Sequence, residues 1–276
     1  MSQHNYLSDQ TDMSKPKKVH HKSGRKAKTI LFHSFRPGVG RSSISANIAY
    51  LLASQGRRIG LIDTDTKSPI LHNLFGLDET LFGYSFNDYL ARACTLEEAT
   101  YDITPHLDDK IKGQISLIPA SPGSVKTGRE LDDTSDVDQF NTDCRKLIDT
   151  LELDALLIDI QPGLSEKALV SITISDTLVI VLHLDQRDYQ GTSVTMDIVR
   201  KLKIPRVMLI INEAPKNFDY NDVKAKVENT YHCEVAAILP HVDEIMALGN
   251  QDVFVRHYPN HPVSDTLRAA AAKLME

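Results

Sequence analysis

Cysteine is scarce in this chain, and its placement excludes several classes of protein. The 276 residues contain Cys94, Cys144 and Cys233, which lie far apart and form no C-x-x-C pair. That spacing argues against an iron–sulfur cluster, a zinc site and a disulfide framework. A chain without disulfides suits a reducing compartment, so we expect a cytoplasmic protein.

Long apolar runs are missing as well. No segment approaches the ~20 apolar residues that a membrane-spanning helix requires, and the N-terminal residues lack the apolar core of a signal peptide. We therefore expect no transmembrane segment. The sequence also shows no internal repeat and no break that would divide it into two folded domains.

Charge is distributed unevenly along the chain. The net charge is −6, but residues 1–28 hold seven Lys and Arg against two Asp, a net of +5, which leaves −11 on the rest. Residues 1–27 are polar, basic and without hydrophobic period, so we predict a disordered arm ahead of one domain at residues 28–276. We favour a solubilising tail for this arm; the alternative is contact with anionic lipid, DNA or an acidic partner.

Short apolar runs alternate with helix-period segments from Thr29 onward. The runs are continuous rather than alternating, which is typical of strands covered by helices on both faces. The sequence therefore predicts an α/β fold, with a doubly wound, mostly parallel sheet flanked by helices. The predicted strands are residues 30–32, 59–62, 115–118, 155–158, 178–182, 207–211 and 235–239.

Helices are predicted between these strands from apolar residues at helical spacing. The predictions are a helix over residues 42–55 with Gly56 just beyond it, one with a face of Val194, Ile198, Val199 and Leu202, one with Val223, Val227 and Tyr231, and a last helix over residues 265–276. Asp185 and Asp188 are expected to cap a helix, with contact to a partner as the alternative. Residues 130–138 are acidic, so we expect a solvated loop there.

A glycine-containing segment follows the first predicted strand, at the sheet edge where ligands of such folds bind. It reads Arg36-Pro37-Gly38-Val39-Gly40-Arg41-Ser42-Ser43. Gly38 and Gly40 let backbone N–H groups converge on phosphate oxygens, and the helix that follows adds a favourable dipole. We predict a phosphate-binding loop here, with Arg41 reaching the phosphates and the Ser42 hydroxyl ligating Mg²⁺. A turn without a ligand is the alternative.

The loop departs from the common pattern G-x-x-x-x-G-K-[ST], because Phe35 replaces the first glycine and Arg41 the lysine. It matches a deviant form, K-G-G-x-G-K-[ST]-[ST], with arginine at both lysine positions, Arg36 and Arg41. Residues 43–49 are also close to T-x-x-A-N-L-A. The chain therefore resembles the MinD/ParA family of positioning ATPases, and the resemblance implies binding of ATP or ADP with Mg²⁺.

Two acidic motifs at later strand ends strengthen the resemblance. By position in the family, Asp65 places the attacking water and helps to order Mg²⁺, with Asp63 in support. Asp159 begins a segment similar to the family's D-x-P-P-G and would bind Mg²⁺ through water. Gly163 would offer its N–H to the γ-phosphate.

Three further roles follow from the resemblance alone. Asn212 would read the adenine base, and Pro240 would pack beside it. Arg36 would reach across a homodimer that closes around ATP, to the nucleotide of the partner.

The two arginines change what can be expected of the site. Arginine is bulkier than lysine and forked, so the exchange is not conservative at a phosphate site. Pro37 also removes an N–H where the family has glycine. We expect ATP or ADP to bind, with Asp65, Arg36 and Arg41 as the catalytic set and with slow or absent hydrolysis.

The function expected is that of a nucleotide-dependent, dimeric spatial regulator that positions or partitions a cellular cargo. It would act on a regulatory or cargo protein and touch DNA or membrane through the basic arm, which would place it in the cytoplasm or at the periphery of the nucleoid or membrane. The alternative is a non-hydrolysing scaffold on the same fold that recruits an assembly. A metabolic ligase or reductase is disfavoured, because the sequence shows neither extra substrate residues nor a bridging cysteine pair.

Overall fold

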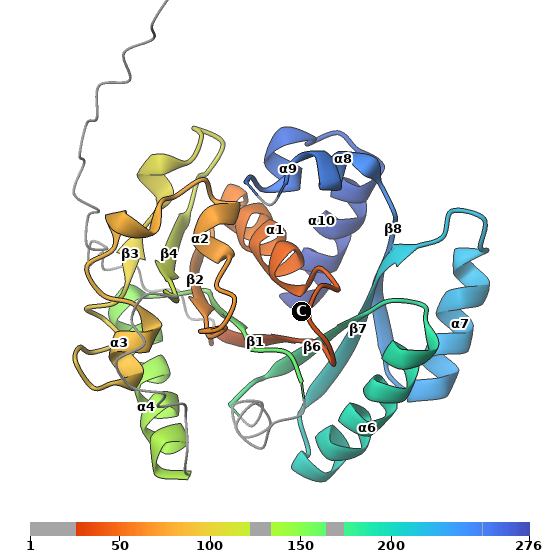
Figure 1. Cartoon of the computed structure of the whole chain (residues 1–276), viewed down its shortest axis with the longest axis horizontal. Helices are drawn as coiled ribbons and strands as arrows, with labels where there is room; N and C mark the ends of the chain where they lie inside the picture. Colours follow the sequence, from red (N-terminus) through yellow and green to blue (C-terminus); the bar gives the residue numbers. More distant parts are fainter. Residues whose placement is uncertain (1–25, 122–133, 164–173, 250) are drawn as a thin grey trace, which may run out of the picture.

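One sheet organises the chain. The computed structural model describes residues 26–121, 134–163, 174–249 and 251–276, and these contain an eight-stranded sheet in the order β3-β4-β2-β5-β1-β6-β7-β8 (Figure 1). The strands are β1 (Lys28–His33), β2 (Arg58–Asp63), β3 (Tyr101–Asp102), β4 (Gln114–Ile118), β5 (Ala155–Asp159), β6 (Thr177–Leu182), β7 (Arg206–Ala214) and β8 (Glu234–Pro240).

The pairing is parallel throughout except between β3 and β4. All seven predicted strands are present, so the predicted α/β class and the mostly parallel sheet are confirmed. β3 was not predicted, because two residues are too few to form a recognisable apolar run.

Helices cover both faces of the sheet, as Figure 1 shows. One face is covered by α1 (Arg41–Ser54), α2 (Leu71–Leu74), α9 (Phe254–His257) and α10 (Pro262–Leu274). The other is covered by α3 (Phe86–Leu90), α4 (Thr134–Leu151), α6 (Gln186–Leu202) and α7 (Tyr220–Tyr231). The short α8 (Asp243–Ala247) follows β8, and single 3₁₀ turns lie at Glu79–Leu81 and Thr104–His106. Each face of the sheet therefore has its own apolar core.

Two helix predictions need correction. The acidic segment 130–138 was expected to be a loop, but its residues 134–138 form the first turns of α4, where Val137 is buried; residues 130–133 lie outside the described part of the chain. The last helix begins at Pro262, three residues earlier than expected, because proline suits the first turn of a helix.

The buried face of α6 also differs from the prediction. Val194 is 50% exposed, and the residues that face the sheet include Gly191, Thr195 and Met196. Thr195 Oγ1 donates a hydrogen bond to the Gly191 carbonyl, so this polar side chain is satisfied within its own helix. The residues that face the core here are therefore small, or polar with a hydrogen bond inside the helix. A search for apolar residues at helical spacing cannot find them.

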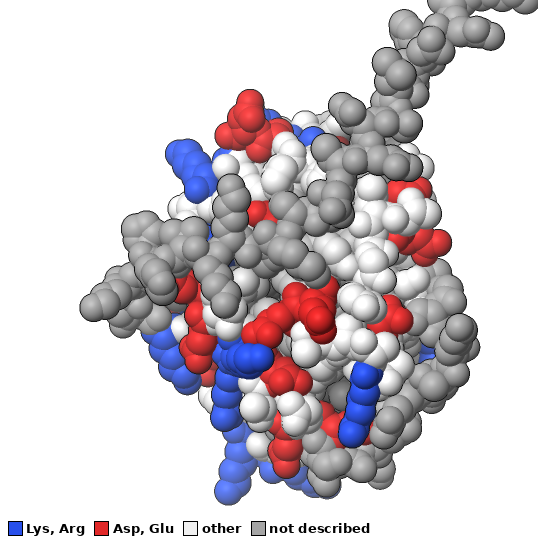
Figure 2. Space-filling model, turned by 90° about the vertical axis from the view of Figure 1, so that its left-hand side faces the viewer, with Lys and Arg blue, Asp and Glu red and all other residues white. Residues whose placement is uncertain are grey.

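The outer surface carries mixed charge. On the face beside β3 and α3, acidic side chains occupy the middle and lysines and arginines lie mostly in its lower part (Figure 2). Among the described residues, none of the helices has the length and apolar character needed to cross a bilayer. The basic arm predicted at residues 1–27 lies, except for its last two residues, outside the described part of the chain.

His33 ends β1 with its side chain fully buried. Neither ring nitrogen has a hydrogen-bond partner among the described residues. Burial, aided by the positive charge of Arg41, lowers the pKa of His33 from 6.5 to about 3. The native state therefore holds this imidazole neutral, whereas the unfolded chain protonates it below pH 6.5.

We predict that His33 makes the protein sensitive to mild acid. Because the pKa of His33 is lower in the native state than in the unfolded chain, protonation favours unfolding. The contribution of this side chain to stability is therefore full above pH 6.5 and is lost as the pH falls toward 3. Between pH 7 and pH 5 the free energy of unfolding should fall by about 2 kcal/mol less in His33→Leu than in the wild type, as measured by urea unfolding. The control is His232→Asn, which replaces an exposed histidine at a left-handed position that asparagine tolerates. Parallel pH profiles for the wild type and His33→Leu would contradict the prediction.

Candidate functional site

The predicted motifs meet where three neighbouring strands end. β5 lies between β1 and β2, and Asp63 is paired in register with Asp159. The loop between β1 and α1 leads directly into the helix, which starts at Arg41. Parallel strands thus bring the loop and both acidic motifs to one edge, as expected.

Two glycines give this loop its shape. Gly38 and Gly40 have φ angles of 81° and 83°, in the left-handed region that other residues rarely adopt. Gly40 also caps the N-terminus of α1, and a Cβ at this position would collide with the Asn212 amide. The loop backbone is therefore wrapped at the start of a 14-residue helix, the geometry of an anion site.

Arg41 points toward the acidic motifs. Its Nε donates to Asp159 Oδ1 at 2.6 Å, and Nη2 lies 3.3 Å from Asp159 Oδ2 and 3.4 Å from Asp65 Oδ2. The Arg41 side chain is 6% exposed and that of Asp159 is fully buried. The guanidinium predicted to reach phosphate is thus held by a carboxylate at the end of β5.

This ion pair is charged on both sides. Burial favours neutral Arg41, but the charge and hydrogen bond of Asp159, with the charges of Asp65 and Asp63, offset it and raise the pKa of Arg41. Burial also raises the pKa of Asp159, against the opposing charge of Arg41. Because arginine does not deprotonate in proteins, the close contact keeps Asp159 ionised. Removing either partner of such a buried pair costs ~3–5 kcal/mol.

Oxygen donors suited to Mg²⁺ are present, but each already takes part in hydrogen bonds within the chain. Ser42 Oγ donates to Asp159 Oδ2 at 2.5 Å, and Arg41 covers both oxygens of Asp159. Asp63 accepts backbone N–H bonds from Asp65, Ile70 and Leu71 through its two oxygens. Arg41 Nη2 lies beside three of the predicted ligands, Ser42, Asp65 and Asp159, and Asp63 is turned to the backbone. While the guanidinium stays there, the predicted set does not fit the ion.

The two switch aspartates organise the segment after β2. Asp65 Oδ1 accepts the N–H groups of Lys67 and Ser68 at 3.3 and 3.1 Å, while its Oδ2 faces Arg41. Burial and then the neighbouring charge of Asp159 raise the pKa of Asp63 to about 7, although backbone N–H donors oppose the rise. Asp63 is thus a buried support for the loop, and Asp65 is the carboxylate that faces the cleft.

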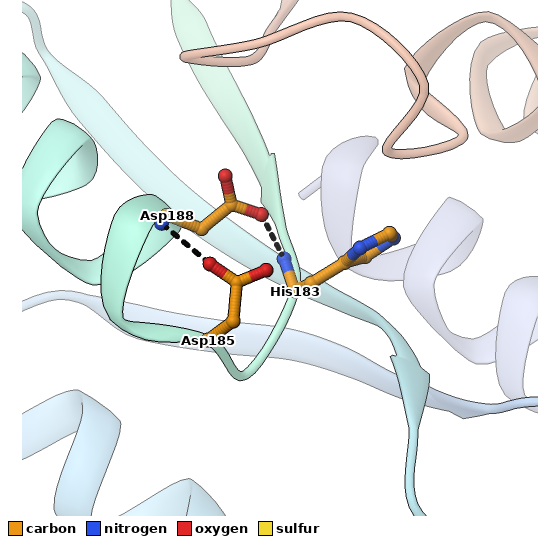
Figure 3. Close-up of side chains that lie close together, drawn as sticks. All are labelled: His183, Asp185 and Asp188. Carbon is orange, nitrogen blue, oxygen red and sulfur yellow. Dashed lines mark hydrogen bonds between the residues drawn. The ribbon is translucent and has the colours of Figure 1, made fainter.

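Arg36 is held within its own chain. Its Nε donates to Asp188 Oδ1 at 2.6 Å, and Nη2 contacts Asp188 Oδ2, Asp185 Oδ2 and the ring of His183. Figure 3 shows His183, Asp185 and Asp188 at the end of β6 and the start of α6, where the Asp188 carboxylate accepts the His183 backbone N–H and Asp185 accepts that of Asp188. These three side chains have the spacing of a metal cluster, but the Arg36 guanidinium is the cation among them.

The residues of the β6–α6 corner were only partly anticipated. Asp185 caps α6 as predicted, by accepting the Asp188 N–H at 2.9 Å. Its pairing with Arg36 was not predicted. Phe35, which stands where the common pattern has glycine, packs its ring so close to Gly191 that a Cβ there would collide with it. The first half of the loop is therefore fastened to α6 by one apolar and one ionic contact.

The remaining predicted residues are engaged with the fold. Asn212 lies inside β7 rather than at the end of a strand, because β7 continues through a bulge to Ala214. Its Nδ2 donates to the Val39 carbonyl at 3.0 Å. The Gly163 N–H donates to the Ser34 carbonyl at 3.0 Å, so the predicted phosphate contact would require this bond to break. Pro240 ends β8 as expected.

A cleft of about 440 Å³ opens beside these residues. Its polar end is lined by the loop, including Gly38, Gly40 and Ser43, together with Arg41 and Asp65. Its other end is apolar, and the sequence did not predict it; the side chains that line it include Leu239, Ile245, Met246, Phe254 and Leu267. They come from four elements, β8, α8, α9 and α10, which only the fold brings together, so no local motif could mark them.

The chain matches known proteins along most of its length. The AAA domain family matches residues 27–208. An uncharacterized ATP-binding protein of Methanocaldococcus jannaschii is 25% identical over 249 residues, which cover 89% of this chain and 87% of that protein.

Solved structures share the fold. The MinD cell division protein of Aquifex aeolicus superposes with a TM-score of 0.72 at 19% identity, over 90% of this chain and 97% of that one. The septum site-determining protein MinD of Pyrococcus horikoshii, complexed with Mg-ADP, has a TM-score of 0.69 at 17% identity, over 90% and 96% of the two chains. With the family match over more than half of the sequence and a loop of the deviant type, the chain belongs to the MinD/ParA family of P-loop ATPases.

Proposed function

We propose that the protein is a nucleotide-dependent spatial regulator that binds ATP or ADP in the cleft beside the loop. It would form a homodimer around ATP and act on a regulatory or cargo protein, with contacts to DNA or membrane through the basic arm. The observation that carries the proposal is the loop itself, with two left-handed glycines at the start of α1 and two carboxylates, of Asp65 and Asp159, beside it.

The two ends of the cleft suit the two ends of a nucleotide. The loop and the N-terminus of α1 favour a phosphate chain, because backbone N–H groups and the helix dipole at a helix start attract anions. The apolar end, with Ile245 and Phe254, offers a surface on which a base can pack. Phosphates at the loop would direct the base toward this apolar end. Asn212 also lines the cleft, and its amide would have to leave the Val39 carbonyl to read the base.

Slow or absent hydrolysis is part of the proposal. A phosphoryl transfer site needs its cation aimed at the transferring group. Arg41 is aimed instead at Asp159, and one oxygen of Asp65 also faces Arg41. To reach a γ-phosphate, the Arg41 guanidinium would have to leave the buried carboxylate of Asp159. Binding of the base at the apolar end of the cleft would have to offset that cost in free energy.

The position of Arg36 favours the scaffold as a second candidate. Arg36 is 28% exposed and holds the buried Asp188, so it is not displayed for a neighbouring subunit. A protein that does not exchange Arg36 across a dimer would have one oligomeric state with and without nucleotide. Size-exclusion chromatography with light scattering, run with and without a non-hydrolysable ATP analogue, separates the two functions.

We predict nucleotide binding with little turnover. Equilibrium binding of radiolabelled ATP should be detectable, while phosphate release stays far below that of Arg36→Lys/Arg41→Lys. One well-aimed charge is worth ~10³-fold or more in phosphoryl transfer, so we expect the double variant to be faster by at least about tenfold. Its control is Arg57→Lys/Arg92→Lys, two partly exposed arginines away from the cleft.

Two results would contradict this prediction. Turnover by the wild type as fast as that of the double variant would show that the arginines do not impede hydrolysis. A complete lack of ATP and ADP binding by the folded wild type would refute the proposed function.

We also predict that the ion pair of Arg36 opposes dimerisation. Asp188→Asn keeps an oxygen for the His183 N–H, which Asp188 Oδ2 accepts at 2.8 Å. It removes the buried one of the two carboxylate charges that hold Arg36, while that of Asp185 remains. With the ATP analogue bound, light scattering should show a dimer at least about tenfold tighter than that of the wild type.

The matched control is Asp222→Asn on α7, whose exposed partner Lys226 lies 3.4 Å away. This change should leave the dimer affinity unaltered. Equal dimer fractions in the wild type and in a folded Asp188→Asn variant would mean that Arg36 has no part in association.

A further inference from the structure

The position that a metal would take beside the loop is filled by a side chain of the protein. A divalent cation would take the Ser42 oxygen as a ligand and meet the Asp159 carboxylate through water, so it would need the space beside both groups. In this structure those two groups are hydrogen-bonded directly, with 2.5 Å between their oxygens. Arg41 Nη2 contacts both, at 3.3 Å from Ser42 Oγ and 3.3 Å from Asp159 Oδ2. A positive charge thus already lies where the metal charge would be.

Burial makes this arrangement hard to displace. Arg41 is 6% exposed, Asp159 is fully buried and the Asp65 side chain is 10% exposed. A metal ion could enter only if the guanidinium left both carboxylates and found other acceptors. An ammonium at this position would be a single point charge, whereas the arginine fork spans Asp159 and Asp65 at once.

The guanidinium also borders the cleft. Arg41 lines the cleft together with Gly38, Gly40, Ser42 and Ser43. Toward the described residues it donates through Nε and Nη2, which leaves the Nη1 group for a phosphate oxygen. Arginine binds phosphate well, because its planar N–H groups match the oxyanion. One side chain can therefore neutralise the carboxylates and contact the phosphate, the two tasks that a metal ion performs in such sites.

We propose that Arg41 is the resident cation of this site and replaces magnesium, so that the cleft binds adenine nucleotide in its metal-free form. The inference rests on the proposed nucleotide binding and adds the chemical form of the ligand. The preference is assigned to Arg41, because the oxygen donors of Ser42, Asp65 and Asp159 are present and the guanidinium occupies the space beside them.

Calorimetry on the full-length protein tests the proposal with ADP and ATP, in buffer with excess MgCl₂ and in buffer with EDTA. The wild type should bind at least as tightly in EDTA as in magnesium. Arg41→Lys restores a compact charge that leaves room for the ion, so its affinity should be at least about tenfold higher with magnesium than without. Arg57→Lys, at an ion pair with Asp154 away from the cleft, should behave like the wild type.

The outcomes separate the inference from the proposed function. Wild-type binding that appears only with magnesium would overturn the inference and leave the proposed function standing. Binding in neither buffer would overturn both. A thermal melt with MgCl₂ alone adds a readout that needs no nucleotide and no variant: the wild-type midpoint should not rise, and a saturable rise would show that the ion enters the site.

Discussion

The buried ion pair between Arg41 and Asp159 is the contact on which the ligand edge depends. Asp159 ends β5 without exposed surface, and a carboxylate in that position needs a cation or a proton. Arg41 supplies the cation from the first turn of α1, and Ser42 adds a hydrogen bond from the same turn. The pair therefore fixes the start of α1 against the sheet, and with it the loop whose backbone would meet a phosphate.

A second ion pair holds the other half of the loop. Arg36 binds Asp188 at the start of α6, on the face of the sheet opposite α1. The loop is thus fixed at one end to the β5 terminus and at the other to α6. A lysine could make one such contact as a point charge, but the forked guanidinium contacts two carboxylates in each case. Arginine at both positions gives a loop that is ordered by its own subunit.

Much of the fold and little of the side-chain geometry could be predicted from the sequence. The strands were predictable because residues buried on both sides form continuous apolar runs, and parallel connection then brought Asp63, Asp159 and the loop to one edge. The face of α6 was not, because Gly191 and Thr195 carry no apolar signal. The partners of the arginines were not predictable either, since Arg41 and Asp159 are 118 positions apart and Arg36 and Asp188 are 152 apart. Which of several nearby anions a guanidinium selects depends on distances that only the folded chain sets.

A residue that keeps the charge of the one it replaces does not necessarily keep its role in a phosphate site. Arg36 and Arg41 keep the positive charges of the deviant loop, and the sequence alone therefore suggests a weakened version of the same chemistry. The structure shows these charges directed to carboxylates of the same chain, Asp188 and Asp159. A guanidinium has several donors, so it can bind a protein carboxylate and still offer an N–H to a ligand. In a metal-dependent site with lysine, these two tasks are divided between the metal ion and the ammonium. If Arg41 is the resident cation as we propose, the exchange of lysine for arginine at this position changes which cation the site uses, while the charge of the side chain stays the same.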